Sequence, residues 1–132
     1  MTTELFWLAL TAIFTGLFWV PYILDRTAVR GLLPAMGNPS PNDKPQSAWA
    51  QRMMKAHANA IENLAVMAVL VLVANAAKVT SDLTVFAVQL YFWARMAHFL
   101  IYAVGIPVLR TLAFATAFVG QAIMALALIG WL

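Results

Sequence analysis

Four long apolar runs limit what this chain can fold into more than any other feature. Each is close to the length of about 20 residues that a helix needs to cross the hydrocarbon core of a bilayer. The predicted spans cover about residues 5–24, 56–77, 83–104 and 109–131. Hydrophobic residues make up 64% of the 132 residues and charged residues only 10%. A soluble domain of this size could not bury so much apolar surface, so we expect an integral membrane protein.

The connections between the runs predict how the helices are arranged. Residues 25–47 form the only long polar segment, and its prolines and the Gly37-Asn38-Pro39 turn signal predict a loop. The helical pattern of the second span extends back to Ala48, so its first turns should project from the membrane core. The two later connections are short, which predicts antiparallel neighbours. The fold class is therefore all-α: a single domain over residues 1–132, built as an up-down four-helix bundle.

The basic residues predict the orientation. Most of them lie in or beside the first and third loops, whereas the opposite side has only Lys78. By the positive-inside rule, both termini lie outside and these two loops lie in the cytoplasm. The eight basic residues form no basic stripe, so no nucleic acid is expected as a partner. The chain has no cysteine, so it offers no disulfide, zinc site or thiol nucleophile of its own, and no metal is expected.

Two of the predicted helices carry nearly all the ionisable residues at membrane depth. On the second span, spacings of three, four and three place four polar residues on one face: Arg52, Lys55, Asn59 and Glu62. On the third span, spacings of three and four do the same for Arg95, His98 and Tyr102. Glu62 and Arg95 should be roughly level, so the two faces could line one polar pocket open to the cytoplasm. An ion pair between Glu62 and Arg95 that only holds the bundle together explains the spacing equally well.

Three motifs then resemble those of a known family. They are Arg52-Met-Met-Lys55-Ala56-His57-Ala58-Asn59-Ala60-Ile61-Glu62-Asn63-Leu64, Arg95-Met-Ala-His98-Phe-Leu-Ile-Tyr102 and Pro107-Val-Leu-Arg110-Thr111, with a weaker match at Arg30 and Gly37-Asn38-Pro39. Together they resemble the membrane-associated proteins in eicosanoid and glutathione metabolism (MAPEG). This family includes microsomal glutathione transferases and prostaglandin E synthase. The likeness is closer to bacterial members than to any named mammalian enzyme.

The resemblance implies a homotrimer in a bacterial inner membrane, with glutathione bound between subunits on the cytoplasmic side. The residues it implies as contacts for glutathione are Arg30, Arg52, Lys55, Asn59, Glu62, Arg95, His98 and Tyr102. Among them, Glu62 would pair with the glutamyl ammonium, and Lys55 stands where the family usually has arginine. Arg110 matches the arginine that stabilises the thiolate, with Thr111 where some members use serine.

The residue types fit this chemistry. A free thiol has a pKa near 8.5, and an adjacent cation lowers it. Arg110 stays charged, so it would favour the thiolate as a fixed cation and hydrogen-bond donor. A pocket with one carboxylate and several cations also matches glutathione, which carries two carboxylates and one ammonium. We therefore expect a glutathione transferase or peroxidase that acts on hydrophobic electrophiles drawn from the bilayer.

Two other functions are compatible with parts of the sequence. A non-catalytic lipid-binding protein could share the fold; Arg110, Asn59 and Glu62 argue against it, while Lys55 and Ala58, where several members carry arginine, keep it open. A small transporter would need a continuous polar lane or discontinuous helices. The polar residues stop about halfway across the membrane, which disfavours transport.

Overall fold

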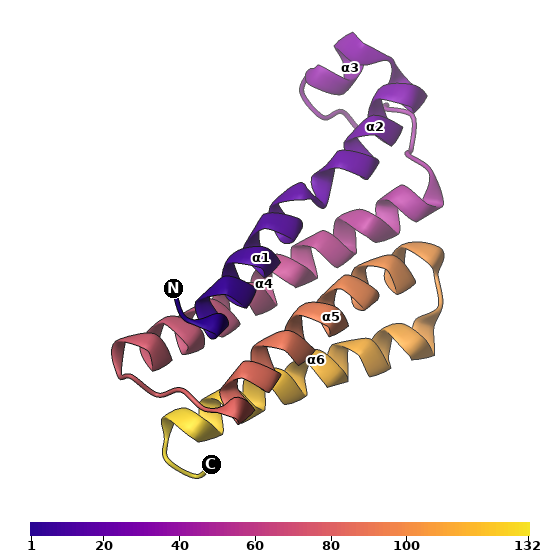
Figure 1. Ribbon diagram of the computed structural model, residues 1–132. Coiled ribbons are helices and arrows are strands. Elements are labelled where there is room, and N and C mark those ends of the chain that lie inside the picture. Colours follow the sequence, from indigo (N-terminus) through magenta and orange to yellow (C-terminus); the bar gives the residue numbers. More distant parts are fainter.

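The computed structural model describes all 132 residues, and all six of its secondary-structure elements are helices. Four helical stretches are long and apolar enough to cross a membrane: Thr3–Arg30, Ala48–Ala76, Asp82–Val104 and Pro107–Leu128. The first comprises α1 (Thr3–Leu17) and α2 (Trp19–Arg30), and the others are α4, α5 and α6. Figure 1 shows them side by side, with both termini at one end of the bundle and the short α3 (Leu32–Met36) at the other. The four-helix membrane fold predicted from the sequence is confirmed.

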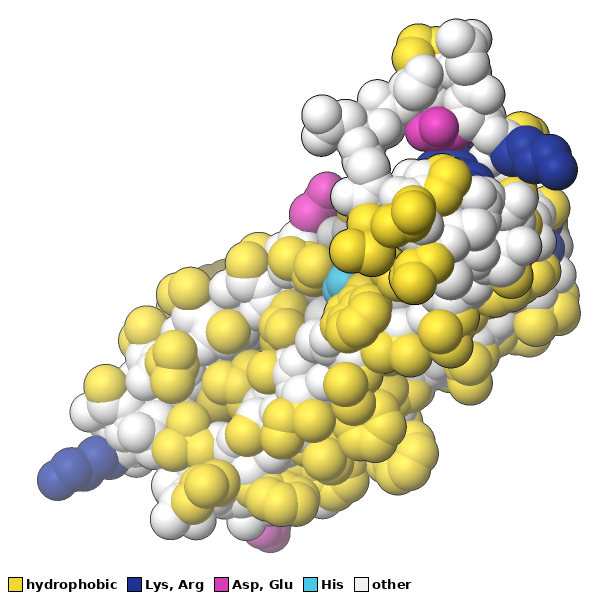
Figure 2. Space-filling view, turned by 90° about the horizontal axis from the view of Figure 1, so that it is seen from above, with side chains coloured by type: hydrophobic (Ala, Val, Ile, Leu, Met, Phe, Trp, Pro, Cys, Tyr) yellow, Lys and Arg dark blue, Asp and Glu magenta, His cyan; other side chains and the backbone are white.

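Charge and apolar surface are separated on the outside of the bundle. Figure 2 shows hydrophobic side chains over the middle of the visible face and lysine or arginine side chains toward its two ends. Large apolar residues are exposed along every long helix, among them Ile13, Val69, Leu100 and Phe118. This distribution fits a protein whose middle part is surrounded by lipid and whose two ends are in water.

The first membrane helix is longer than the sequence predicted. Pro21 has no N–H to donate to the carbonyl of Leu17, and the helix is interrupted at Phe18. It then resumes and ends at Arg30, six residues beyond the predicted end of the span at Leu24. The polar segment predicted as a loop therefore begins with the last turns of α2, and it also contains α3.

Hydrogen bonds of Asp25 explain why α2 continues through polar residues. This carboxylate is buried, and it accepts hydrogen bonds from the Ser47 backbone N–H at 3.1 Å and the Gln46 amide at 3.2 Å. The same Gln46 amide nitrogen donates to the carbonyl of Tyr22 at 2.7 Å, and its oxygen accepts from Arg26 at 3.1 Å. The polar end of α2 is thus fixed to the residues that precede α4.

Helices α5 and α6 approach each other closely at Gly120. A Cβ atom on Gly120 would lie 2.7 Å from the carbonyl oxygen of Ala87 on α5. A buried cluster surrounds this contact: Met67, Val71, Ala74, Val88, Tyr91, Ala94, Ala117 and Met124. A small residue at position 120 therefore allows the close packing of these two helices.

Replacing Gly120 by alanine should lower the thermal stability of the protein. Alanine improves helix propensity by about 1 kcal/mol, but overpacking at a tight contact costs about 1–3 kcal/mol. Gly16→Ala is the matched control, because nothing lies within 4 Å of a Cβ at Gly16. Thermal unfolding of detergent-purified variants should show a lower midpoint for Gly120→Ala and an equal or higher one for Gly16→Ala. Equal midpoints for Gly120→Ala and wild type would contradict the close contact.

Candidate functional site

A polar hollow lies near the turn between α5 and α6, at the end of the bundle that carries α3. Its volume is about 240 Å³, and its lining comes from α4, α5 and α6: Asn59, His98, Tyr102, Arg110, Thr111 and Phe114. All of these side chains except Phe114 carry a polar group. Five residues predicted for the site from sequence are therefore neighbours in the structure.

The turn between α5 and α6 determines where Arg110 lies. Gly105 ends α5 in the left-handed conformation, with φ of 93°, and Pro107 is the first residue of α6. Arg110 therefore falls in the first turn of α6. Before the turn, at the C-terminus of α5, the carbonyl oxygen of Ala103 accepts a hydrogen bond from Arg52 Nε at 3.0 Å. This bond satisfies one of the carbonyls that a helix leaves unpaired at its C-terminus.

The guanidinium of Arg110 lies over an aromatic ring. Its central carbon is 4.4 Å from the centroid of the Tyr102 ring, within the range of a cation–π interaction. The His98 ring is 5.6 Å from that of Tyr102 and 6.2 Å from that of Phe114. An arginine held by a ring face keeps its N–H donors available for a ligand in the hollow.

Arg95 lies behind the hollow as a buried cation. It is only 2% exposed, and its Nη2 donates to Asn59 Oδ1 at 2.8 Å, while Nε and Nη1 have no partner. No carboxylate of the chain lies within 4 Å of it, so the alternative of a Glu62–Arg95 ion pair is not found within the chain. Arg95 is level with Asn59, about 4.5 Å along α4 from Glu62. Its contact fixes the side chain of Asn59 at the wall of the hollow.

Lys55 and Glu62 are exposed on α4 and do not line the hollow. Since Arg52 contacts the C-terminus of α5, Glu62 lies about 15 Å deeper along α4. This depth is near the middle of a hydrocarbon core about 30 Å thick. A carboxylate facing lipid there costs several kcal/mol. The exposed face of α4 at Glu62 therefore requires a polar cover in the membrane.

Arg30 and Arg52 also lie outside the hollow. Arg30 Nε donates to the carbonyl oxygen of Lys44 at 2.8 Å, and its Nη1 is 3.7 Å from a carboxylate oxygen of Asp43. Arg52 is engaged by α5, as described above. Within one chain, five predicted site residues thus do not line the hollow: Arg95 lies behind it, and Arg30, Arg52, Lys55 and Glu62 lie away from it.

Sequence reasoning missed Phe114. It lies in a mostly apolar stretch of α6, where one aromatic residue does not stand out. Its only signal is its position four residues after Arg110, which places both on one face of α6. The hollow thus has an apolar wall beside its cation.

Four membrane-crossing helices with a polar hollow near one end define an integral multi-pass membrane protein. A sequence model of the MAPEG family matches residues 5–130 of the chain. The chain therefore belongs to the MAPEG family, whose members are typically glutathione-dependent membrane enzymes. No curated protein and no solved structure matches the chain significantly.

Proposed function

We propose that the protein binds glutathione at the α5–α6 hollow and activates its thiol for attack on a hydrophobic electrophile from the bilayer. It would thus be a membrane-bound glutathione transferase or peroxidase. The observation that carries this proposal is the arrangement of Arg110 over Tyr102, beside His98 and Asn59, around one hollow. Family membership supports glutathione as the substrate, whose thiol would provide the nucleophile that the cysteine-free chain lacks.

The charges of the site complement those of glutathione. The guanidinium of Arg110 would stabilise the thiolate, which is the reactive nucleophile. Glu62 would pair with the glutamyl ammonium, and Lys55 would meet a carboxylate as a point charge without the bidentate fork of arginine. The Asn59 amide, oriented by Arg95, would hydrogen-bond the peptide.

Two reactions of the thiolate are compatible with this site. In a transferase, the sulfur forms a bond to an electrophilic carbon, and the leaving group departs with the electrons of the broken bond. In a peroxidase, the sulfur forms a bond to one oxygen of a peroxide, and the O–O bond breaks so that the other oxygen leaves as an alcohol or water. A second glutathione then attacks the resulting sulfenic acid, which releases water and forms glutathione disulfide. The apolar Phe114 wall suits the hydrophobic substrate in either case.

A single chain supplies only part of this site. The hollow, at about 240 Å³, is smaller than the roughly 300–1,000 Å³ of typical small-molecule sites. We infer that a homotrimer completes it, with a second copy covering the α4 face on which Glu62 and Lys55 are exposed. Arg30, which lines a different hollow in its own chain, would then contact glutathione bound against a neighbouring copy.

The orientation of the chain agrees with a cytoplasmic site. The hollow lies near the turn between α5 and α6, at the same end of the bundle as α3 and the polar segment (Figure 1). Six of the eight basic residues lie in or beside the two connections at this end. The positive-inside rule places this end in the cytoplasm, where glutathione maintains reduced thiols.

Glutathione binding to the detergent-purified protein tests the proposal. Titration should produce a saturable ultraviolet thiolate band near neutral pH, because Arg110 lowers the thiol pKa. S-methylglutathione should compete for the same site without producing the band. No binding of glutathione would overturn the proposal. Binding without the band would instead favour the non-catalytic lipid-binding alternative.

A further inference from the structure

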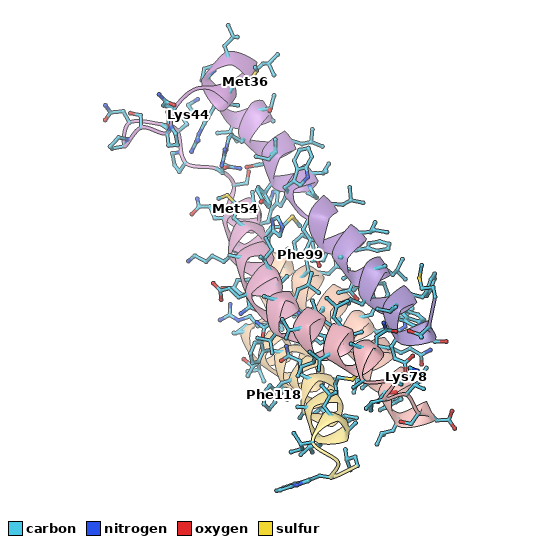
Figure 3. The ribbon with its side chains drawn as sticks, turned by 90° about the vertical axis from the view of Figure 1, so that its left-hand side faces the viewer. Met36, Lys44, Met54, Lys78, Phe99 and Phe118 are labelled. Atoms are coloured by element: carbon cyan, nitrogen blue, oxygen red, sulfur yellow. The ribbon has the colours of Figure 1, made fainter.

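A second hollow lies at the end of the bundle opposite the candidate glutathione site. Its volume is about 220 Å³, and it forms where α1 begins and α4 ends. Its polar lining consists of Thr2, Glu4, Asn75, Lys78 and Thr80. Figure 3 shows Lys78 at the far end of the molecule from Met36 and Lys44. The proposed function makes no use of this hollow.

Glu4 places a buried carboxylate in the second hollow. The residue is only 5% exposed, and the hydroxyls of Thr80 and Thr84 both donate to its Oε1, at 2.6 and 2.7 Å. Oε2 accepts no hydrogen bond from the chain, and no cationic group of the chain lies within 4 Å. A buried carboxylate is costly unless it is paired and hydrogen-bonded. Glu4 is therefore suited to a ligand that carries both a positive charge and an N–H donor.

Lys78 lines the same hollow with the opposite charge. It is exposed and has a backbone φ of 59°, a left-handed conformation that is uncommon outside glycine. The hollow thus has a carboxylate and an ammonium among its lining side chains. This pair complements a zwitterionic ligand, whose cation would meet Glu4 and whose anion would meet Lys78.

An apolar groove lies on the same pair of helices. Its volume is about 430 Å³, and all its lining residues are hydrophobic, among them Leu5, Leu8, Ala12, Leu64, Ala68 and Leu72. Along α4 the groove reaches Leu72, next to Val71 of the second hollow. The distance between Lys78 and Leu64 along the helix axis is about 21 Å. This distance matches the thickness of one leaflet of about 15 Å together with its headgroup layer.

We propose that α1 and α4 bind one phospholipid whose headgroup carries a primary ammonium, as in phosphatidylethanolamine. The ammonium donates to Glu4 Oε2, the phosphate pairs with Lys78, and one acyl chain occupies the apolar groove. A choline headgroup has no N–H to donate, and a glycerol headgroup has no positive charge. The two charged side chains thus select the headgroup, while the groove binds the chain.

Native mass spectrometry of the full-length protein with chain-matched ethanolamine, choline and glycerol phospholipids tests the headgroup. The wild type should retain the ethanolamine lipid about tenfold better than the other two, as expected for one charge-assisted hydrogen bond. Glu4→Gln keeps an acceptor for Thr80 and Thr84 and should abolish this preference. Lys78→Asn removes the cation, and asparagine is compatible with the left-handed backbone at this position. This variant should retain all three lipids less well. Lys44→Asn, at the other end, should change nothing.

A second pair of variants tests the groove. Ala68→Phe should fill it and reduce retention of all three lipids, whereas Ala97→Phe, on an exposed position of α5, should not. Equal retention of the three headgroups by the wild type, or an unchanged preference in Glu4→Gln, would overturn the proposal. A change in the number of protein copies in Ala68→Phe, without a change in bound lipid, would overturn it too. The groove would then be a contact between copies.

Discussion

Arg110→Ala should lower the rate of glutathione conjugation about 50-fold at pH 6.5 and abolish the thiolate band at that pH. A cation in contact with a thiol lowers the thiol pKa from about 8.5 to about 6.5, so half of the bound glutathione is thiolate at pH 6.5. Without the cation, about 1% is thiolate. The measurement is the initial rate with a hydrophobic electrophile at saturating glutathione, together with the ultraviolet absorbance of the complex.

The pH dependence separates this role from simple binding. Because the variant retains the ordinary thiol pKa, its rate should rise about tenfold per pH unit up to about pH 8.5, while the wild-type rate levels off near pH 7. The two rates should therefore approach each other at pH 9. Arg110→Lys keeps the charge but loses the planar guanidinium, so its rate should lie between those of the wild type and Arg110→Ala. A pH profile of Arg110→Ala parallel to that of the wild type would mean that Arg110 does not act on the thiol.

Glu62→Gln should weaken glutathione binding about 30-fold or more. Removing one partner of a buried charge pair costs at least about 2 kcal/mol, which corresponds to this change in Kd. Glutamine has nearly the same shape as glutamate, so the effect reports the charge. Calorimetric titration of glutathione into each protein measures the two dissociation constants.

A glutathione analogue with an acetylated glutamyl nitrogen identifies the ligand group involved. It has no ammonium, so it should bind weakly and with equal affinity to wild type and Glu62→Gln, as a double-mutant cycle requires for a direct pair. Asp82→Asn removes an exposed acid at the opposite end of the bundle and serves as the control. A 30-fold loss with the acetylated analogue as well would show that Glu62 does not bind the ammonium.

The lengths of the apolar runs predicted the membrane helices well, because crossing the bilayer sets a minimum length that few other segments reach. The third predicted span, residues 83–104, differs from α5 by one residue at its start. The first span was predicted less accurately at its end. Polarity marks where the apolar run stops, but Asp25 keeps the helix going through hydrogen bonds to residues more than 20 positions away. No local pattern carries that information.

The site residues were grouped by the helical face on which their spacing places them. This grouping alone does not determine which of the residues meet in the structure. Spacing placed Asn59 and Glu62 on one side of α4 and His98 and Tyr102 on one side of α5. The rotation of each helix against its neighbours then decides which members of a face meet. As a result, Asn59 lines the hollow, while Glu62 points to the surface of the single chain. Spacing likewise could not show that Arg95 would bond to Asn59 instead of forming an ion pair.

The bond between Arg52 and Ala103 has a consequence for reading mutational scans of this protein. Arg52 fixes the end of α5, next to Gly105, and the turn that follows starts the helix carrying Arg110. Variants of Arg52 would therefore lose turnover through a displaced Arg110 and resemble active-site variants in a screen scored by activity alone. Measuring the abundance and the glutathione affinity of each variant together with its turnover would reveal that Arg52 acts by holding the turn between α5 and α6 in place.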